Sequence, residues 1–259
     1  MQAVSLPATA GWYWIAKGWA LFKCQPMALF SWAMFVTLVL IFATITAPVG
    51  PLVFIALMPA VTLMTLSITR HVDQGQRLTP AMWFARLKPS GLIKKLLILG
   101  VLYVFICLTV GFLVFLPFAG ELNEAIQTLV DTENAEPLIN TLQTPILLFA
   151  AFYFLLAALF WYSPILIGWH GTTIGKALFF SAIACWRNKW AFLVYAIAWA
   201  AIFFIVDLLV GAIVSIGLPI DIAAALQLPL NVLLGSVLYA SFYPTYQDVF
   251  RQVDTPTEV

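Results

Sequence analysis

Asp207 is the ionisable side chain whose position most strongly indicates a chemical role. It lies within residues 203–209, inside a long apolar segment. A carboxylate deep in a bilayer costs about 2.5–3.5 kcal/mol on insertion scales, so it is normally neutralised, paired or turned inward. One interpretation is a proton or cation site completed by Gln227 and Asn231. The other is a structural residue that is protonated, hydrogen-bonded or close enough to the outer surface to meet water.

Two histidines and a second aspartate are the remaining candidates for chemistry. His71 and His170 each follow the end of an apolar segment, and Asp73 lies two residues after His71. These residues could serve an enzyme that acts on lipid, although their spacing matches no recognised catalytic arrangement. Two histidines without a nearby carboxylate or cysteine pair are weak evidence for a metal site, so side chains at headgroup level are the simpler interpretation.

The sequence contains no motif that specifies a cofactor, a metal or a nucleotide. GxSxG, HExxH and GxGxxG are absent, and residues 171–176 fail as a phosphate-binding loop because three residues, not four, separate the glycines. Cys24, Cys107 and Cys185 are odd in number and far apart, which predicts neither a disulfide framework nor zinc. We therefore expect no cofactor and no metal site.

Composition identifies the solvent that surrounds this chain. Of 259 residues, 63% are hydrophobic and 9% are charged, with a mean hydropathy of +1.02. Soluble domains are roughly half apolar and a quarter charged, because their surface must remain largely polar. The lipid bilayer is therefore the expected partner of most of the surface. A net charge of +1 gives no reason to expect nucleic acid.

Apolar segments of the length needed to cross a bilayer recur six times. A hydrocarbon core of about 30 Å needs about 20 apolar residues in a helix. The predicted spans are residues 27–47, 52–69, 96–118, 145–168, 190–216 and 222–243. Short connections predict one integral membrane domain over residues 1–259, an all-α, polytopic helical bundle. Residues 119–144 are expected to form an outer loop whose charged residues are all acidic.

The basic residues predict the orientation of these spans. In a six-span chain all 12 Lys and Arg residues fall on one side, and the opposite loops contain none. Basic residues accumulate on the cytoplasmic side of membrane proteins, so we expect both termini in the cytoplasm of a bacterium, with the protein in its inner membrane. A miscounted span would scatter the basic residues over both sides.

Three amphipathic segments precede the first, third and fifth spans on the basic side. In residues 9–24, Trp12, Ile15, Trp19 and Phe22 recur at helical spacing, which predicts an interfacial helix. Ile174, Leu178, Ala182 and Trp186 recur before the fifth span. The residues predicted to form an interfacial or partner-binding surface are Trp12, Trp19, Lys23, Trp83, Arg86, Trp186 and Arg187. Such segments could simply lie among the headgroups, or they could bind a partner or anionic lipid.

Several short stretches also resemble a known group of proteins. They are residues 18–23 followed by Pro26, residues 48–51 with Pro59, residues 184–188, and residues 239–250. Together, over nearly the whole chain, they resemble an uncharacterised family of proteobacterial inner-membrane proteins. The resemblance implies six helices in the cytoplasmic membrane, and it implies no catalytic residues.

Three functions remain open from the sequence. The first is a non-enzymatic scaffold, or an accessory or assembly factor, for a membrane complex, with a membrane-protein partner or a second copy of the chain. It is favoured because catalytic motifs are absent and the basic side is rich in tryptophan. The second is a small transporter or channel that uses Asp207. The third is a lipid-acting enzyme.

Overall fold

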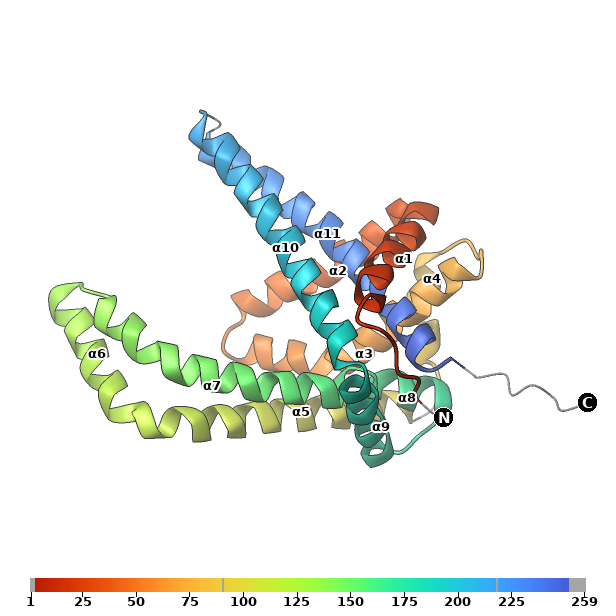
Figure 1. Ribbon diagram of the computed structural model, residues 1–259, viewed down its shortest axis with the longest axis horizontal. Helices are drawn as coiled ribbons and strands as arrows, with labels where there is room; N and C mark the ends of the chain where they lie inside the picture. The colour runs from red at the N-terminus through yellow and green to blue at the C-terminus, as the bar shows by residue number, and fades with distance from the viewer. Residues whose placement is uncertain (1–2, 90, 218, 252–259) are drawn as a thin grey trace, which may run out of the picture.

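The computed structural model describes residues 3–89, 91–217 and 219–251, and within these residues it contains helices and no strands (Figure 1). The elements are α1 (Ala10–Cys24), α2 (Pro26–Ile45), α3 (Val49–Asp73), α4 (Pro80–Trp83), η1 (Ala85–Leu87), α5 (Leu92–Phe115), η2 (Leu116–Phe118), α6 (Ala119–Thr132), α7 (Glu136–Phe160), α8 (Ser163–His170), α9 (Ile174–Arg187), α10 (Lys189–Ser215) and α11 (Ile220–Val249). Six helical segments are long and apolar enough to cross a membrane. The all-α, six-span fold class is thereby confirmed.

The six spans pack as an open row. Helix α10 packs on α11, α11 on α2, α2 on α3, α3 on α5, and α5 on α7. The helices at the two ends of the row, α7 and α10, make no extensive contact with each other. Of the six spans, α3 is the most buried and α10 the least. The end helices therefore present flanks that only lipid or another protein can cover.

Two long hairpins diverge from a common body. The body contains α1, α4, α8, α9 and the C-terminal end of α11 (Figure 1). One arm is the hairpin of α5 and α7 with α6 at its tip, and the second arm is the α10–α11 hairpin; the α2–α3 hairpin is drawn between them (Figure 1). The chain is therefore held together mainly at the body.

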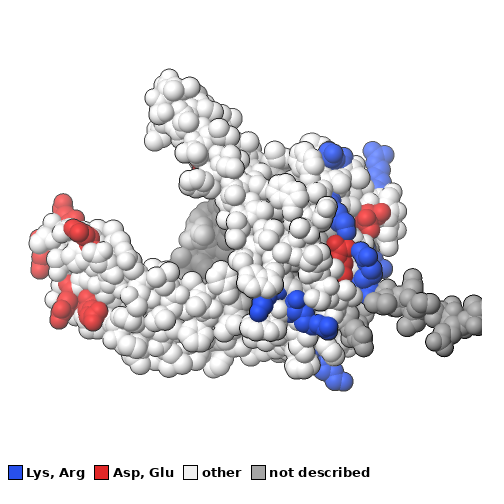
Figure 2. All heavy atoms as spheres, in the orientation of Figure 1, with Lys and Arg blue, Asp and Glu red and all other residues white. Residues whose placement is uncertain are grey.

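Charges separate along the first arm in the way that the sequence predicts. Lys and Arg side chains gather on the body, whereas the tip of the arm carries only acidic ones (Figure 2). The expected outer loop at residues 119–144 is, however, helical: α6 occupies Ala119–Thr132 and α7 begins at Glu136. The prediction of a loop was wrong because α6 is amphipathic, burying Ala125 against α7 while its acidic side chains face outward.

The fourth span also differs from its predicted limits. Helix α7 ends at Phe160, and α8 begins at Ser163 instead of continuing to residue 168. Pro164 in the first turn of α8 lacks an amide proton, which favours a helix start there. The Tyr162 amide at the break donates to Ser181 Oγ at 2.9 Å, so the interruption is satisfied by α9.

Helix α1 is packed against the spans through glycine. A Cβ atom at Gly11 would collide with the Ala191 carbonyl oxygen of α10, and one at Gly18 would collide with Ser241 of α11. Glycine is thus required for the close approach of these backbones. The face that α1 buries contains Ala10, Gly11, Trp14, Ile15, Gly18 and Phe22.

The four residues of the N-terminal apolar stripe divide between the packed and the exposed sides of α1. Ile15 and Phe22 are buried, but Trp12 and Trp19 are 58% and 47% exposed. In the segment before the fifth span, α9 buries Ala177, Ser181, Ala184 and Cys185, while Trp186 is exposed. In both helices small residues, which permit close backbone approach, mark the packed face better than large ones do.

Replacing Gly18 with alanine tests the close approach of α1 to α11. We expect Gly18→Ala to destabilise the folded protein by about 1–3 kcal/mol, because the added methyl overpacks the contact with Ser241. Gly175→Ala is the matched control, since open space surrounds that position in α9. The measurement is the thermal unfolding of the purified variants in detergent. Equal melting temperatures for the two variants would contradict the packing described here.

Candidate functional site

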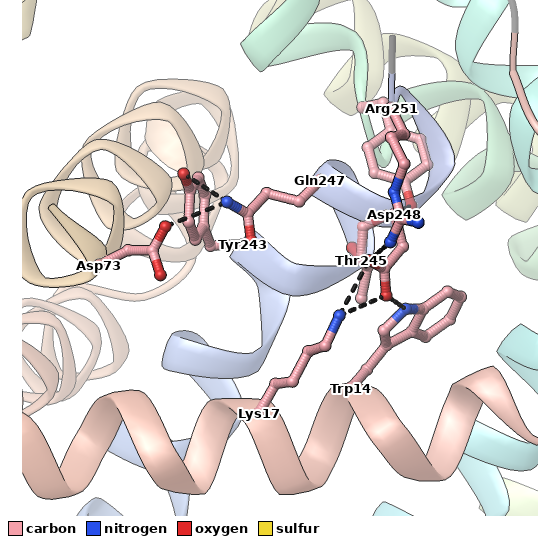
Figure 3. Close-up of polar contacts among 9 residues, drawn as sticks. Trp14, Lys17, Asp73, Tyr243, Thr245, Gln247, Asp248 and Arg251 are labelled. Carbon is pink, nitrogen blue, oxygen red and sulfur yellow. Dashed lines mark hydrogen bonds and ion pairs between the residues drawn. The ribbon is translucent and has the colours of Figure 1, made fainter. Parts of the chain in front are cut away.

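Asp248, near the end of α11, joins three donors at the body. One carboxylate oxygen accepts hydrogen bonds from Trp14 Nε1 at 3.1 Å and from Lys17 Nζ at 3.0 Å. The other accepts from Lys17 Nζ at 2.9 Å and from Arg251 at 3.1 Å (Figure 3). We call these four residues the Asp248 cluster. It ties α1 to α11 in addition to the glycine contact.

The Asp248 cluster explains how a carboxylate is tolerated in a nearly buried position. Only 12% of the Asp248 side chain is exposed, whereas Lys17 and Arg251 keep 48% and 69% of theirs. Two cations and an indole N–H replace the water that the carboxylate loses, and the cations remain hydrated. The Asp248 carboxylate is therefore satisfied by groups of the protein itself.

A second polar group lies one residue away on α11. Gln247 donates from its amide to Asp73 at 3.1 Å and to the Tyr243 hydroxyl at 2.9 Å (Figure 3). Because Asp73 ends α3, this contact links α11 to the most buried span. The end of α11 thus touches α1 on one side and α3 on the other.

Between these contacts the body contains a cavity of about 700 Å³, which we call the α11 cavity. Its lining comes from α1, α3, α8 and the last turns of α11 together with the residues that follow. Its lining residues are Lys17, Arg70, Asp73, Gln74, Trp169, His170, Tyr243, Tyr246, Gln247, Asp248, Phe250 and Arg251. The charged members are three cations and two carboxylates, so the lining is positive overall.

Aromatic side chains orient the remaining groups of the α11 cavity. The Arg70 guanidinium lies 4.9 Å from the centroid of the Trp169 ring, a cation–π distance. His170 Nε2 is hydrogen-bonded to the Tyr246 hydroxyl, and Trp169 Nε1 donates to Ser67 Oγ at 3.3 Å. The walls are thereby fixed by contacts from α3, α8 and α11.

The structure brings some of the predicted candidates for lipid chemistry together. His170 and Asp73 line the same cavity, although they are far apart in sequence. His71 does not line it, and its Nδ1 is hydrogen-bonded to Gln76 Oε1 at 2.6 Å. The nucleophile and base pair that a hydrolytic enzyme needs are not formed by these three residues.

The intramembrane candidates lie at the other end of α11. Gln227 Nε2 donates to Asp207 Oδ1 at 2.9 Å, which joins α10 to α11. Asp207 and Asn231 are exposed on the arm, and Gln227 is half-buried. Gln227 precedes Tyr243 by 16 residues, or about 24 Å at 1.5 Å of rise per residue. Asp207, Gln227 and Asn231 therefore belong to a separate site from the α11 cavity.

The predicted interfacial residues divide into two kinds. Trp12, Trp19 and Trp186 are exposed on the body, with Lys23 6.0 Å from the Trp19 ring. Arg187 is exposed as well. Trp83 is half-buried and packs edge-on against Trp32, with ring centroids 5.4 Å apart. Trp83 is thus mainly a packing residue, while the others form a surface.

Arg86 belongs to neither of these two kinds. It is exposed, and its guanidinium donates to the Gly168 carbonyl at 3.4 Å, at the end of α8. It does not line the α11 cavity. Arg86 is therefore a surface cation whose surroundings differ from those of Arg70.

Sequence reasoning missed the residues that organise the body. Lys17 and Arg70 were counted only for orientation, and Asp248 only as part of the C-terminal stretch. One available signal was that Asp248 is an acid on the basic side of the chain, which implies a cationic partner nearby. The pairing itself spans more than 230 residues and has no local signature.

Comparisons with known proteins are consistent with this architecture. A protein of Burkholderia thailandensis named "Probable inner membrane protein" is 29% identical over 263 residues, which cover 96% of this chain and 94% of that protein. No family model and no solved structure matches the chain. This similarity and the six candidate spans identify the chain as a multi-pass inner membrane protein, and they confirm the expected resemblance to such proteins.

Substituting Asp248 tests whether the Asp248 cluster holds the body together. We expect Asp248→Asn to destabilise the protein by about 1–3 kcal/mol, since Lys17 and Trp14 lose an ionised acceptor in a nearly buried position. Asp73→Asn is the matched control, because Asp73 is exposed and an amide oxygen can still accept from Gln247. Thermal unfolding in detergent measures both. An unfolding temperature for Asp248→Asn at or above that of the control would contradict this role.

Proposed function

We propose that the protein is a non-catalytic scaffold or accessory subunit of the inner membrane, which binds another membrane protein through the α10–α11 arm. Both termini and the body lie in the cytoplasm in this proposal, and the tip of the other arm lies outside. The observation that carries the proposal is Asp207, which is exposed on α10, the least buried span, and is hydrogen-bonded to Gln227 of α11.

The separation of charge supports the orientation. The basic residues surround the body and the acidic tip of α6 lies at the far end of an apolar arm (Figure 2). Retention of Lys and Arg on the cytoplasmic side is the strongest determinant of topology, so the body is the cytoplasmic part.

The depth of Asp207 supports a protein partner rather than lipid. Asp207 follows Lys189 by 18 residues and precedes Ser215 by eight, which places it about 27 Å from the body end of α10 and about 12 Å from the outer end. A hydrocarbon core of about 30 Å centred on this helix includes Asp207. One amide donor leaves most acceptor sites of the carboxylate unfilled, which is costly on a lipid-facing flank.

The chemistry of the missing donor favours a different protein over a second copy. In the proposed orientation every Lys and Arg of this chain lies at the cytoplasmic side, so a parallel copy offers no cation at the depth of Asp207. A transmembrane helix with a basic side chain at that depth would pair with the carboxylate. We therefore propose such a helix as the partner.

The native cysteines test the orientation. Cys24 is exposed at the end of α1, whereas burial raises the pKa of the Cys185 thiol to about 12. At pH 8 a membrane-impermeant maleimide should label Cys24 in inside-out vesicles and leave Cys185 unlabelled, because the thiolate is the reactive form. In a variant without native cysteines, Glu124→Cys on α6 should label only from the outside. Labelling of Cys24 from the outside would overturn the orientation.

Site-specific crosslinking tests the partner surface. Phe204 lies one turn before Asp207 and is 67% exposed, and Phe105 on α5 is 66% exposed and serves as the matched control. We expect benzoylphenylalanine at position 204 to form one discrete protein adduct in membranes, and at position 105 to crosslink only lipid.

The yield of the position-204 adduct in an Asp207→Asn variant decides whether that adduct supports the proposal. The substitution removes the charge and leaves an amide oxygen that can still accept from Gln227, so the arm should fold and the adduct should decrease strongly. The crosslinked partner segment should also carry a basic side chain within its span. An adduct that is insensitive to Asp207→Asn, or no adduct at position 204, would contradict the proposed function.

A further inference from the structure

We propose that the α11 cavity binds a singly charged phosphodiester, with Arg70 as its principal ligand and Lys17 and Arg251 as supporting cations. The headgroup of an anionic phospholipid and a soluble phosphodiester share this chemistry. The inference is independent of the proposed partner surface, since Asp207 of α10 pairs with Gln227 near the start of α11, whereas the cavity is lined by the end of α11.

Among the residues that the structure describes, Arg70 is the cation of the cavity that forms no ion pair with a carboxylate. The two ion pairs found among the described residues both use Asp248, which engages Lys17 and Arg251. Arg70 instead places its guanidinium 4.9 Å from the Trp169 ring centroid. A cation–π contact does not engage the guanidinium N–H groups in hydrogen bonds to an acceptor oxygen, so their fork geometry, which matches phosphate oxygens, can be used for an anion.

The other walls supply secondary contacts for such an anion. The Lys17 side chain is 48% exposed although its ammonium group, which has three donors, contacts Asp248. The hydrogen-bonded pair of His170 and Tyr246 lines the same space. A phosphate near Arg70 would therefore meet a second cation and two polar aromatic groups within one cavity.

Asp73 determines which phosphates suit the cavity. Its exposed carboxylate lines the same space as Arg70 and accepts its hydrogen bond from Gln247. A negative charge there opposes a phosphate that carries two charges more than one that carries a single charge. The arrangement thus favours a phosphodiester over inorganic phosphate or a phosphomonoester.

The position of the cavity is accessible to both sources of a phosphodiester. Its lining helices α3 and α8 end at the body, where the basic residues gather (Figure 2). In the proposed orientation this is the cytoplasmic headgroup level, which a lipid enters from the side and a solute from the water. A volume of about 700 Å³ accommodates a headgroup and its glycerol.

Native mass spectrometry of the full-length protein, delipidated in detergent, tests the proposal. The probes are phosphatidylglycerol, phosphatidic acid, and the soluble diester glycerophosphoglycerol with inorganic phosphate beside it. We expect one saturable phosphodiester site, weakened about ten-fold or more by Arg70→Gln. Arg86→Gln removes a neighbouring exposed cation outside the cavity and should leave binding unchanged.

Asp73→Asn provides a variant that gains affinity. It should bind phosphatidic acid and inorganic phosphate about two- to five-fold more tightly, because a repulsive charge is removed while the acceptor for Gln247 remains. A misfolded protein would not produce such a gain, so this variant decides the question even where Arg70→Gln lowers stability.

The outcomes separate cleanly. Arg70-dependent binding of phosphatidylglycerol alone supports a lipid headgroup, and Arg70-dependent binding of the soluble diester as well supports a soluble ligand; both support the site. Equal losses for Arg70→Gln and Arg86→Gln would indicate diffuse attraction to a basic surface and overturn it. Absence of a saturable site, or no gain for Asp73→Asn, would overturn it too.

Discussion

The close approach of α1 to α10 and α11 is the contact on which the rest of the structure depends. Gly11 and Gly18 allow backbones to meet where any side chain would collide. The Asp248 cluster adds an ion pair between α1 and α11 at Lys17, the residue before Gly18. Small residues at helix interfaces serve the same purpose between membrane spans, where the hydrophobic effect gives no preference for protein over lipid. Helix α1 thus fixes the base of the α10–α11 arm.

Fixing the base leaves the far ends of the arms independent. The row of spans is open between α7 and α10, so neither end helix is covered by the other. The body is cross-linked by polar contacts from α1, α3, α8 and α11, whereas the α10–α11 arm is joined near its outer part by the Asp207–Gln227 pair. A cross-linked base with uncovered flanks on α7 and α10 is the geometry expected of a protein whose flanks bind lipid or another protein.

The sequence predicted the number and approximate positions of the spans, because the length and hydropathy of a segment indicate whether its helix can cross the hydrocarbon core. It did not predict which faces pack. In lipid both the buried and the exposed face of a helix are apolar, so the stripe at Trp12, Ile15, Trp19 and Phe22 did not identify the contact made by Gly18. The α11 cavity was missed for another reason: its residues come from four elements, and only the order of packing brings Lys17, Arg70 and Asp248 together.

Asp248 on α11 and Asp207 on α10 show how the number of hydrogen-bond partners distinguishes a structural carboxylate from a functional one. Asp248 is nearly buried, yet two cations and an indole fill its acceptor sites. Asp207 is exposed on an apolar arm, yet it receives one hydrogen bond from Gln227. The folded chain already stabilises a buried carboxylate whose acceptor sites are all filled. A carboxylate exposed to hydrocarbon would be stabilised more by a donor from another molecule. By this comparison Asp248 maintains the fold, and Asp207 is where an interaction with another protein yields the larger stabilisation.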